Sequence, residues 1–376
     1  MDFSLTDEQR ALADLAGKIL ADAATLERLK ATEQSDARYD RDLWAELAKA
    51  GLLGAALPEL VGGSGGGFFE ACLLLEQQGK RVAMLPLLST IVSAAMPLAR
   101  FGSRQQQQRW LPEVVSGKTL LTAALTELDS DSYAPATIAA ADGTGWRLSG
   151  VKTAVPVANR AAAVLVPART ERGDVGIFFV DPQAPGVTLA RQETTNWEAQ
   201  FHLELADVKV GADRLLGSIE RGAQQLSWIV DRTTVGLCAI AAGACQEAVR
   251  LTAEYASNRK QFDKPIAMFQ AVGQRMADAY IDNEAVSVTM WQAATRLHDE
   301  MPSDKEIATA KYWSAEGGSR IGHAALHLHG GISIDVDYPI HRYFLWLKQL
   351  EYTLGAATPQ LARLGALIAA EPVAAG

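Results

Sequence analysis

A block of strand-like sequence between two blocks of helical sequence is the feature that most constrains the fold. Residues 1–117 contain helical segments separated by glycine-rich breaks, and long helical segments return after residue 217. Between them, "AAVLVPA", "VGIFFVD" and "FHLELADVKV" are short, rich in β-branched and aromatic residues, and partly alternating. Runs of strands between runs of helices favour segregated α+β layers over an alternating parallel sheet. The sequence therefore predicts an N-terminal helical domain (1–117), a central antiparallel β domain (118–217) and a C-terminal helical domain (218–376).

Local patterns predict the type of individual elements. In "SLTDEQRALADLAGKIL", Thr6 stands as the N-cap and Gln9 follows three residues later, which is the spacing of a capping box. In "FHLELADVKV", apolar residues from Phe201 to Leu205 alternate with polar ones, which predicts a strand with one buried face. Periodicity and breaks predict further helices around 40–50, 68–82, 86–101, 104–115, 219–257, 266–300, 304–329 and 338–371.

Charge and cysteine usage exclude several classes of function. The 376 residues carry a formal net charge of −9 with no basic run, so nucleic acid is not an expected partner. Cys72, Cys238 and Cys245 lie in apolar surroundings without CxxC spacing, which favours buried thiols over disulfides or metal ligands. No stretch reaches the roughly 18 apolar residues of a membrane span, and the capped helix begins too early to follow a signal peptide. We therefore expect a protein of a reducing compartment, the cytoplasm.

The densest motif is "HLHGGISIDVDYPIHR" at 327–342. Two glycines at the end of a helix favour a C-cap, although paired glycines also let a ligand approach the backbone closely. His323 and His327 have the i, i+4 spacing of a helical metal pair, but no carboxylate cluster accompanies them, so no metal site is expected. In "NRKQFDKPIAMFQ", Arg259 alone is typical of a helix-end cation and Phe262 alone of a core residue. The sequence has no P-loop, GxGxxG or GxSxG motif.

Four stretches together resemble the acyl-CoA dehydrogenase family over essentially the whole chain. They are "DFSLTDEQRALADLAGKIL", "LTAALTE" with "LSGVKTAV", "YASNRKQFDKPIAMFQ" and "ALHLHGGISIDVDYPIHR". The resemblance implies an N-terminal helical domain, a central β domain and a C-terminal four-helix bundle, assembled as a tetramer built from dimers. It also implies an oxidoreductase of lipid metabolism with FAD as cofactor and an acyl-CoA as substrate. In that family a glutamate removes the α-proton while the β-hydride passes to the flavin.

The third and fourth stretches correspond to family segments that reach across the dimer to the ADP half of the neighbouring subunit's FAD. The matching residues are Arg259, Phe262, Gln270, Gly330 and Gly331. Arginine suits a pyrophosphate because its planar fork donates two parallel charge-assisted hydrogen bonds. His327 stands where the family commonly has glutamine, and it can still donate a hydrogen bond.

The flavin-ring half of the family pattern is less complete. The family's "TEPxxGSD" stretch corresponds to "TELDSDSY" (126–133), which keeps Thr126 and Ser132 as cofactor contacts but loses the glycine and the final acid. The family's "WxTN" stretch falls on "AVPV" (154–157), so its tryptophan and its hydroxyl are both absent.

No aligned catalytic base is present. Leu354 occupies the usual position of the glutamate, and Thr233 occupies the alternative position that some members use. Asp231 is a candidate, but it is offset by two residues from Thr233 and would point from a different helix face. Because a leucine cannot accept a proton, the resemblance implies that this chain alone lacks the means for α-deprotonation.

A complex of two unlike subunits accounts both for the retained residues that contact the ADP half of FAD, here called the cradle, and for the missing base. Certain actinobacterial acyl-CoA dehydrogenases of steroid side-chain degradation are similar: two unlike subunits form an α2β2 heterotetramer, and one kind has the glutamate. "GGISIDVDYPIHRYFLWLKQ" resembles the other kind. This implies a homologous glutamate-bearing partner, FAD held in trans, and electron-transfer flavoprotein as electron acceptor. Two alternatives stay open: a homotetramer with an unaligned base (Asp231, Glu351 or Glu127), and a flavin-free structural or acyl-CoA-binding subunit.

Overall fold

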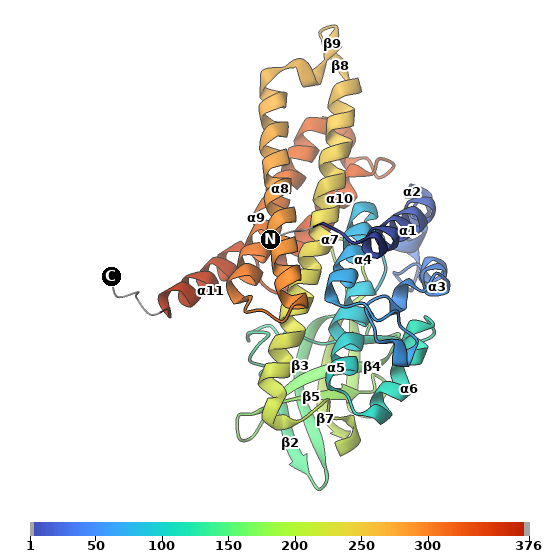
Figure 1. The fold of residues 1–376 in the computed structure, drawn as a ribbon, viewed down its shortest axis with the longest axis vertical. Helices are drawn as coiled ribbons and strands as arrows, with labels where there is room; N and C mark the ends of the chain where they lie inside the picture. The colour runs from blue at the N-terminus through green and yellow to red at the C-terminus, as the bar shows by residue number, and fades with distance from the viewer. Residues whose placement is uncertain (1–3, 372–376) are drawn as a thin grey trace. The chain divides into compact units, whose positions relative to one another are not determined.

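The computed structural model describes residues 4–371, and its elements run from helices through strands to helices along the chain (Figure 1). The chain divides into two compact units that interleave in sequence. The first unit comprises Met1–Lys30, Cys72–Ala83 and Thr234–Gly376, and the second comprises Ala31–Ala71 and Met84–Thr233. The division into three domains at residues 117 and 217 stays a prediction.

The N-terminal segment is helical, as predicted. Its α-helices are α1 (Asp7–Ala23), α2 (Leu26–Gln34), α3 (Arg41–Lys49), α4 (Phe68–Arg81), α5 (Met96–Phe101) and α6 (Arg104–Val115). The capping box of α1 is confirmed, because the Thr6 hydroxyl accepts from the Gln9 amide and the Gln9 side chain accepts from the Thr6 amide. Helix α2 was not predicted, and the segment expected over 86–101 is a π-helix (Leu88–Ala95) followed by α5.

A seven-stranded sheet forms the middle of the chain, in the order β1-β4-β2-β3-β7-β6, with β5 also paired to β4. The strands are β1 (Leu120–Ala123), β2 (Ile138–Asp142), β3 (Gly145–Pro156), β4 (Ala161–Thr170), β5 (Val175–Val180), β6 (Val187–Gln192) and β7 (Gln200–Val210). Four pairings are antiparallel, but β4 runs parallel to both β1 and β2, so the sheet is mixed where an antiparallel one was expected. Alternation in one strand reports its buried face and carries no information on the direction of its neighbour.

Burial along the strands follows the sequence patterns. In β7, Phe201, Leu203 and Leu205 are buried, whereas Glu204 is exposed and His202 half-buried, which confirms the predicted face. All six residues of β5 are buried, as its continuous apolar run "VGIFFV" requires.

The C-terminal segment is helical, and it contains five α-helices within the described range. They are α7 (Gly222–Asn258), α8 (Gln270–His298), α9 (Asp304–His329), α10 (Ile340–Tyr352) and α11 (Ala357–Ala369). Helix α9 packs against α8, α10 and α11. The single helix expected over 338–371 is two helices, because the backbone turns at Leu354 (φ 56°) and Gly355 (φ 94°). The three cysteines are free and buried, as expected.

Close backbone packing joins α4 and α7 within the first unit. A Cβ added to Gly79 would lie 2.0 Å from the carbonyl oxygen of Ile240, and one added to Gly243 would lie 1.9 Å from that of Glu76. Only glycine permits two helices to approach this closely.

One helix corrects the expectation that no segment has the composition of a membrane span. Ile219–Asn258 is 40 residues long, and its most apolar window has a mean hydropathy of 1.2. Of that window 89% is buried inside the protein, which is typical of a core helix. The apolar composition of this helix therefore gives only weak support for a membrane span.

Candidate functional site

The "RKQF" motif forms an exposed hairpin between α7 and α8. Arg259 directly follows α7, and the short strands β8 (Lys260–Gln261) and β9 (Lys264–Pro265) pair at the tip (Figure 1). The Arg259 amide donates to the Tyr255 carbonyl at 2.8 Å, which fixes the backbone at the helix end. The Arg259 side chain is exposed and has no carboxylate within 4.0 Å among residues 4–371. Phe262, expected in the core if taken alone, is 86% exposed, so the ring is available to a ligand or partner.

The diglycine loop begins where α9 ends. The Gly330 amide donates to the Leu326 carbonyl, so the C-cap interpretation is correct. Gly330 has φ 63° and ψ −141°, a conformation that is essentially restricted to glycine. A Cβ added to Gly330 or Gly331 would meet no atom within 4 Å, and both residues are exposed. The open backbone is therefore also suited to close approach by a ligand.

An aromatic stack brings the two motifs to the same end of the first unit. Tyr255, one helical turn before Arg259, stacks on His329 with ring centroids 4.4 Å apart. The Tyr255 hydroxyl also donates to the His329 carbonyl at 3.3 Å, and Tyr338 lies against both rings. His329 immediately precedes Gly330, so this stack fixes the diglycine loop beside the end of α7. Sequence reasoning missed these residues, because a single sequence holds no signal for a pair 74 positions apart.

Burial keeps His329 in its neutral form. Desolvation lowers the pKa of His329, although the hydrogen bond between Nδ1 and the Ala325 carbonyl partly opposes this effect. The ring thus packs in the stack as a neutral aromatic group.

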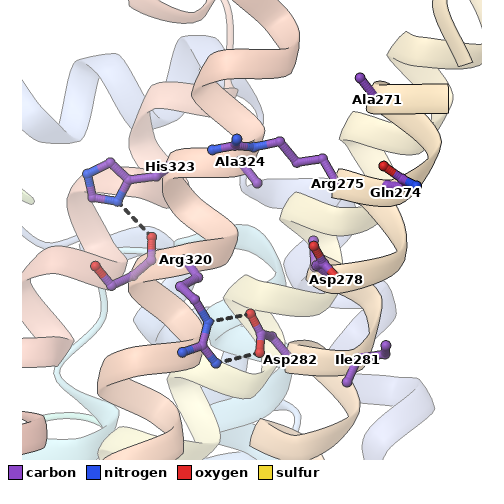
Figure 2. Close-up of a pocket in the computed structure, with 11 residues that line it drawn as sticks. Ala271, Gln274, Arg275, Asp278, Ile281, Asp282, Arg320, His323 and Ala324 are labelled. Carbon is purple, nitrogen blue, oxygen red and sulfur yellow. Dashed lines mark hydrogen bonds and ion pairs between the residues drawn. The ribbon is translucent and has the colours of Figure 1, made fainter. Parts of the chain in front are cut away.

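A groove of about 670 Å³ lies between α8 and α9 in the same unit, starting one residue after Gln270 (Figure 2). Figure 2 shows Arg275 reaching from α8 toward α9, and Arg320 on α9 held by a bidentate ion pair with Asp282, at 2.8 and 2.5 Å. His323 bonds the Ser319 carbonyl within its own helix. The groove continues the surface that bears Gln270, at the start of α8, and His327, one turn after His323, both of which are exposed.

The predicted flavin-ring contacts lie in the second unit. Thr126 pairs with Thr153, whose amide donates to the Thr126 carbonyl at 2.9 Å, and Ser132 lies half-buried in the loop that follows. Between them, Glu127 accepts five hydrogen bonds, including one from the buried Lys152 ammonium at 2.6 Å. Burial alone would raise the pKa of Glu127, but the Lys152 charge and these hydrogen bonds lower it to about 2. A carboxylate so firmly ionised and fully bonded is a poor base.

The other candidate positions for a base are also engaged. The Thr233 hydroxyl is hydrogen-bonded to Ser93 at 3.0 Å, and Asp231 accepts from the Tyr133 hydroxyl at 2.7 Å. Glu351 accepts from Lys348 at 2.6 Å. Leu354 stands in the turn between α10 and α11 at positive φ and offers no acid.

Gly330→Ala is expected to lower the free energy of unfolding by about 1–3 kcal/mol, because alanine must adopt a backbone conformation that only glycine favours. Gly331→Ala is the matched control. It adds the same methyl group to equally open space, but its φ is not positive, so it is expected to change stability by less than about 0.5 kcal/mol. Urea denaturation of both variants measures the difference. Equal effects would contradict the assigned conformation.

Known proteins match the chain over its whole length. The N-terminal domain model of acyl-CoA dehydrogenase matches residues 6–118, and the C-terminal domain model matches 220–368. Acyl-CoA dehydrogenase FadE27 of Mycobacterium tuberculosis is 40% identical over 380 residues, covering 99% of this chain and 100% of FadE27.

Two solved structures show the same fold at high similarity. The ChsE4–ChsE5 complex from Mycobacterium tuberculosis gives a TM-score of 0.94 at 41% identity, covering 99% of this chain and 100% of that one. A variant of the steroid ACAD Tcur3481–Tcur3483 gives 0.91 at 45% identity, covering 96% and 98%. The chain therefore belongs to the acyl-CoA dehydrogenase family of oxidoreductases.

Proposed function

We propose that this chain is the glutamate-lacking subunit of a heteromeric, FAD-dependent acyl-CoA dehydrogenase. In this proposal it supplies its C-terminal hairpin and diglycine loop to the flavin of a partner subunit. The main support is a contrast between two sets of residues: those expected to contact the ADP half of FAD are present, whereas the catalytic base is absent. Arg259, Phe262 and the diglycine are exposed, although the Phe262 ring also lies edge-on against Phe269. In contrast, the positions of the base hold Leu354 and Thr233. Exposed residues that can hold FAD, in a chain that lacks the catalytic base, are suited to serve the active site of another subunit.

The exposed residues fit an anionic, planar dinucleotide. Arg259 would hold the pyrophosphate, since its guanidinium has no carboxylate partner among residues 4–371 and can donate a bidentate pair. Phe262 would pack its ring on the ligand, and Gln270 and His327 would donate hydrogen bonds. Gly330 and Gly331 leave room that any side chain would fill. FAD, when bound, supplies the hydride acceptor, and the role of these residues is to place it.

The relatives support the partner and the substrate class. One similar structure is a complex of two named chains, ChsE4 and ChsE5, and another is described as a steroid ACAD with two named chains. We extend this to a glutamate-bearing homologous partner and to a bulky, steroid-derived acyl-CoA, α,β-dehydrogenated in the complex. Electron-transfer flavoprotein as acceptor and a cytoplasmic location, which the buried free thiols favour, complete the proposal.

Arg259→Ala is expected to weaken FAD binding by the co-purified complex about 10- to 100-fold, because a charge-assisted hydrogen bond contributes roughly 1.5–3 kcal/mol. Lys260→Ala is the matched control: the neighbouring exposed cation lies at the same hairpin and is not assigned to the cofactor. Flavin absorbance per protomer after dialysis measures occupancy. If Arg259→Ala retains the flavin as Lys260→Ala does, Arg259 does not hold FAD, and the result supports the flavin-free structural subunit instead.

Expression of the chain alone and with its partner separates the remaining alternatives. We expect the chain alone to be colourless, and the mixture to hold one FAD for each pair of unlike subunits in a heterotetramer. Flavin absorbance and native mass measure both quantities. A yellow homotetramer of the chain alone, with flavin that an acyl-CoA reduces, would show a self-sufficient enzyme with an unaligned base.

A further inference from the structure

A small basic hollow lies in the second unit, and none of its lining residues is assigned a role above. It has a volume of about 270 Å³ and is lined by Tyr39 and Arg41 at the start of α3, by Gly117–Leu120, and by Arg160 and Ala162 at the start of β4. Three cations, Arg41, Lys118 and Arg160, thus come from three separate segments and converge on one concavity.

Among residues 4–371, a carboxylate pairs with only one of the three cations of the hollow. Neither Arg41 nor Lys118 has a carboxylate within 4.0 Å among residues 4–371. Arg160 pairs with Asp36 at 2.7 Å, but Asp36 is also approached by Arg191 at 3.7 Å, so one carboxylate serves two guanidinium groups. Arg41 and Lys118 are thus exposed cations without a carboxylate partner among residues 4–371, in a chain whose net charge is −9.

The backbone of the hollow is held in place before any ligand arrives. The Trp44 indole donates to the Gly117 carbonyl at 3.1 Å, and the amides of Lys118 and Thr119 donate to the Glu113 carbonyl at 2.9 and 3.2 Å. The Thr119 hydroxyl donates to the Glu113 carboxylate at 2.7 Å, which also fixes this lining residue. A backbone fixed in this way leaves only the exposed Lys118 side chain to be ordered on binding.

We propose that this hollow binds the phosphate group of a small phosphorylated molecule. Two arginines can donate forked, charge-assisted hydrogen bonds to phosphate oxygens, and a lysine adds a point charge. The volume holds a phosphate with a small attached group and is below the roughly 300 Å³ at which pockets for larger ligands begin. A doubly charged phosphate is favoured over a singly charged carboxylate, because two cations of the hollow, Arg41 and Lys118, have no carboxylate partner among residues 4–371.

Isothermal titration of the full-length chain with inorganic phosphate and with glycerol 3-phosphate tests the proposal, at about pH 8, where a phosphate ester is doubly charged. We expect one site per chain, and binding of acetate at least about tenfold weaker because it carries half the charge. Tighter binding of glycerol 3-phosphate identifies an ester as the source of the phosphate, and equal binding identifies the free ion.

The double variant Arg41→Gln, Lys118→Gln is expected to weaken phosphate binding at least about tenfold, since each lost charge-assisted bond costs that much or more. The control is Arg172→Gln, Lys209→Gln, which removes the same net charge from two exposed cations elsewhere in the second unit. We expect the control to bind as the parent chain does. Protection of Lys118 from acetylation by phosphate gives a second, independent readout. Equal weakening in both double variants, or no saturable binding by the parent chain, would overturn the proposal.

Discussion

Lys152→Met is expected to lower the free energy of unfolding by about 3–5 kcal/mol at neutral pH, because it leaves a buried carboxylate without its cation. The Lys152 side chain is 1% exposed and that of Glu127 6% exposed, and their ion pair is 2.6 Å long. Glu127 keeps four further donors, from Ser130, Ala136 and twice from Thr137. These bonds solvate the charge only in part, so the missing ammonium is expected to dominate.

The pair also predicts how stability responds to acid. The pKa of Glu127 is about 2 in the folded chain against 4.5 for the free group. Because the folded pKa is the lower one, its contribution is complete above pH 4.5 and is lost as the pH falls toward 2. At about 1.36 kcal/mol per pKa unit, this contribution amounts to roughly 3 kcal/mol. In Lys152→Met the acid-dependent loss is expected to shrink, because Lys152 is the largest cause that lowers this pKa.

Arg147→Met is the matched control on the same strand. Arg147 pairs with Asp142 at 2.9 Å and with Asp207 at 2.5 Å, but its side chain is 33% exposed. Such a surface pair is expected to contribute at most about 1 kcal/mol. Urea denaturation gives the stabilities, and hydrogen exchange of the Ala136 and Thr137 amides reports the loop directly. If Lys152→Met costs no more than Arg147→Met, the buried pair is not a major source of stability.

Lys311→Met is expected to abolish a rise in stability at alkaline pH. Lys311 on α9 is fully buried, and its ammonium donates to the carbonyls of Leu350 and Glu351 at 2.6 and 3.1 Å. These carbonyls belong to the last turn of α10 and have no further residue of that helix to bond them. The lysine therefore caps α10 immediately before the turn at Leu354.

Burial lowers the pKa of Lys311 from 10.5 to about 8, with nearby Cys238 and Glu351 opposing the effect in part. Between pH 8 and 10.5 the unfolded chain therefore binds a proton that the folded chain does not, so stability rises with pH across this window. The gain is about 3 kcal/mol, at 1.36 kcal/mol for each pKa unit. At neutral pH the variant is expected to lose about 1–3 kcal/mol, because two carbonyls lose their donor.

The difference in unfolding free energy between the parent chain and Lys311→Met, measured near pH 7.5 and pH 10, isolates this lysine, since other titrating groups are common to both proteins. Lys305→Met serves as the control on the same helix, because the Lys305 side chain is 44% exposed and pairs with Glu371 at the surface. Its difference from the parent chain is expected to be independent of pH. If the unfolding free energy of the parent chain minus that of Lys311→Met stays constant or falls as the pH rises, the result would contradict a lowered pKa of Lys311.

Patterns confined to neighbouring residues were predictable from the sequence. The capping box of Thr6 and Gln9 and the buried face of β7 depend on spacings of two to four residues, which one sequence displays directly. The motif residues Arg259 and Gly330 also follow from sequence, and the structure places both on the exposed end of the first unit. Their contact with FAD stays a prediction.

Contacts between distant residues were decided by the tertiary structure alone. Glu127 meets Lys152 across 25 positions, Lys311 meets Leu350 across 39, and Tyr255 meets the His329 carbonyl across 74. The same holds for the parallel pairing of β1 with β4 and for the break between α10 and α11. Hydrophobic periodicity predicts that a residue is buried, but it does not identify the residues that pack against it. A sequence also does not distinguish a buried lysine from an exposed one. The sequence by itself thus determined the family and the type of most elements, whereas three-dimensional packing decided which charges are buried and what holds the cradle in place.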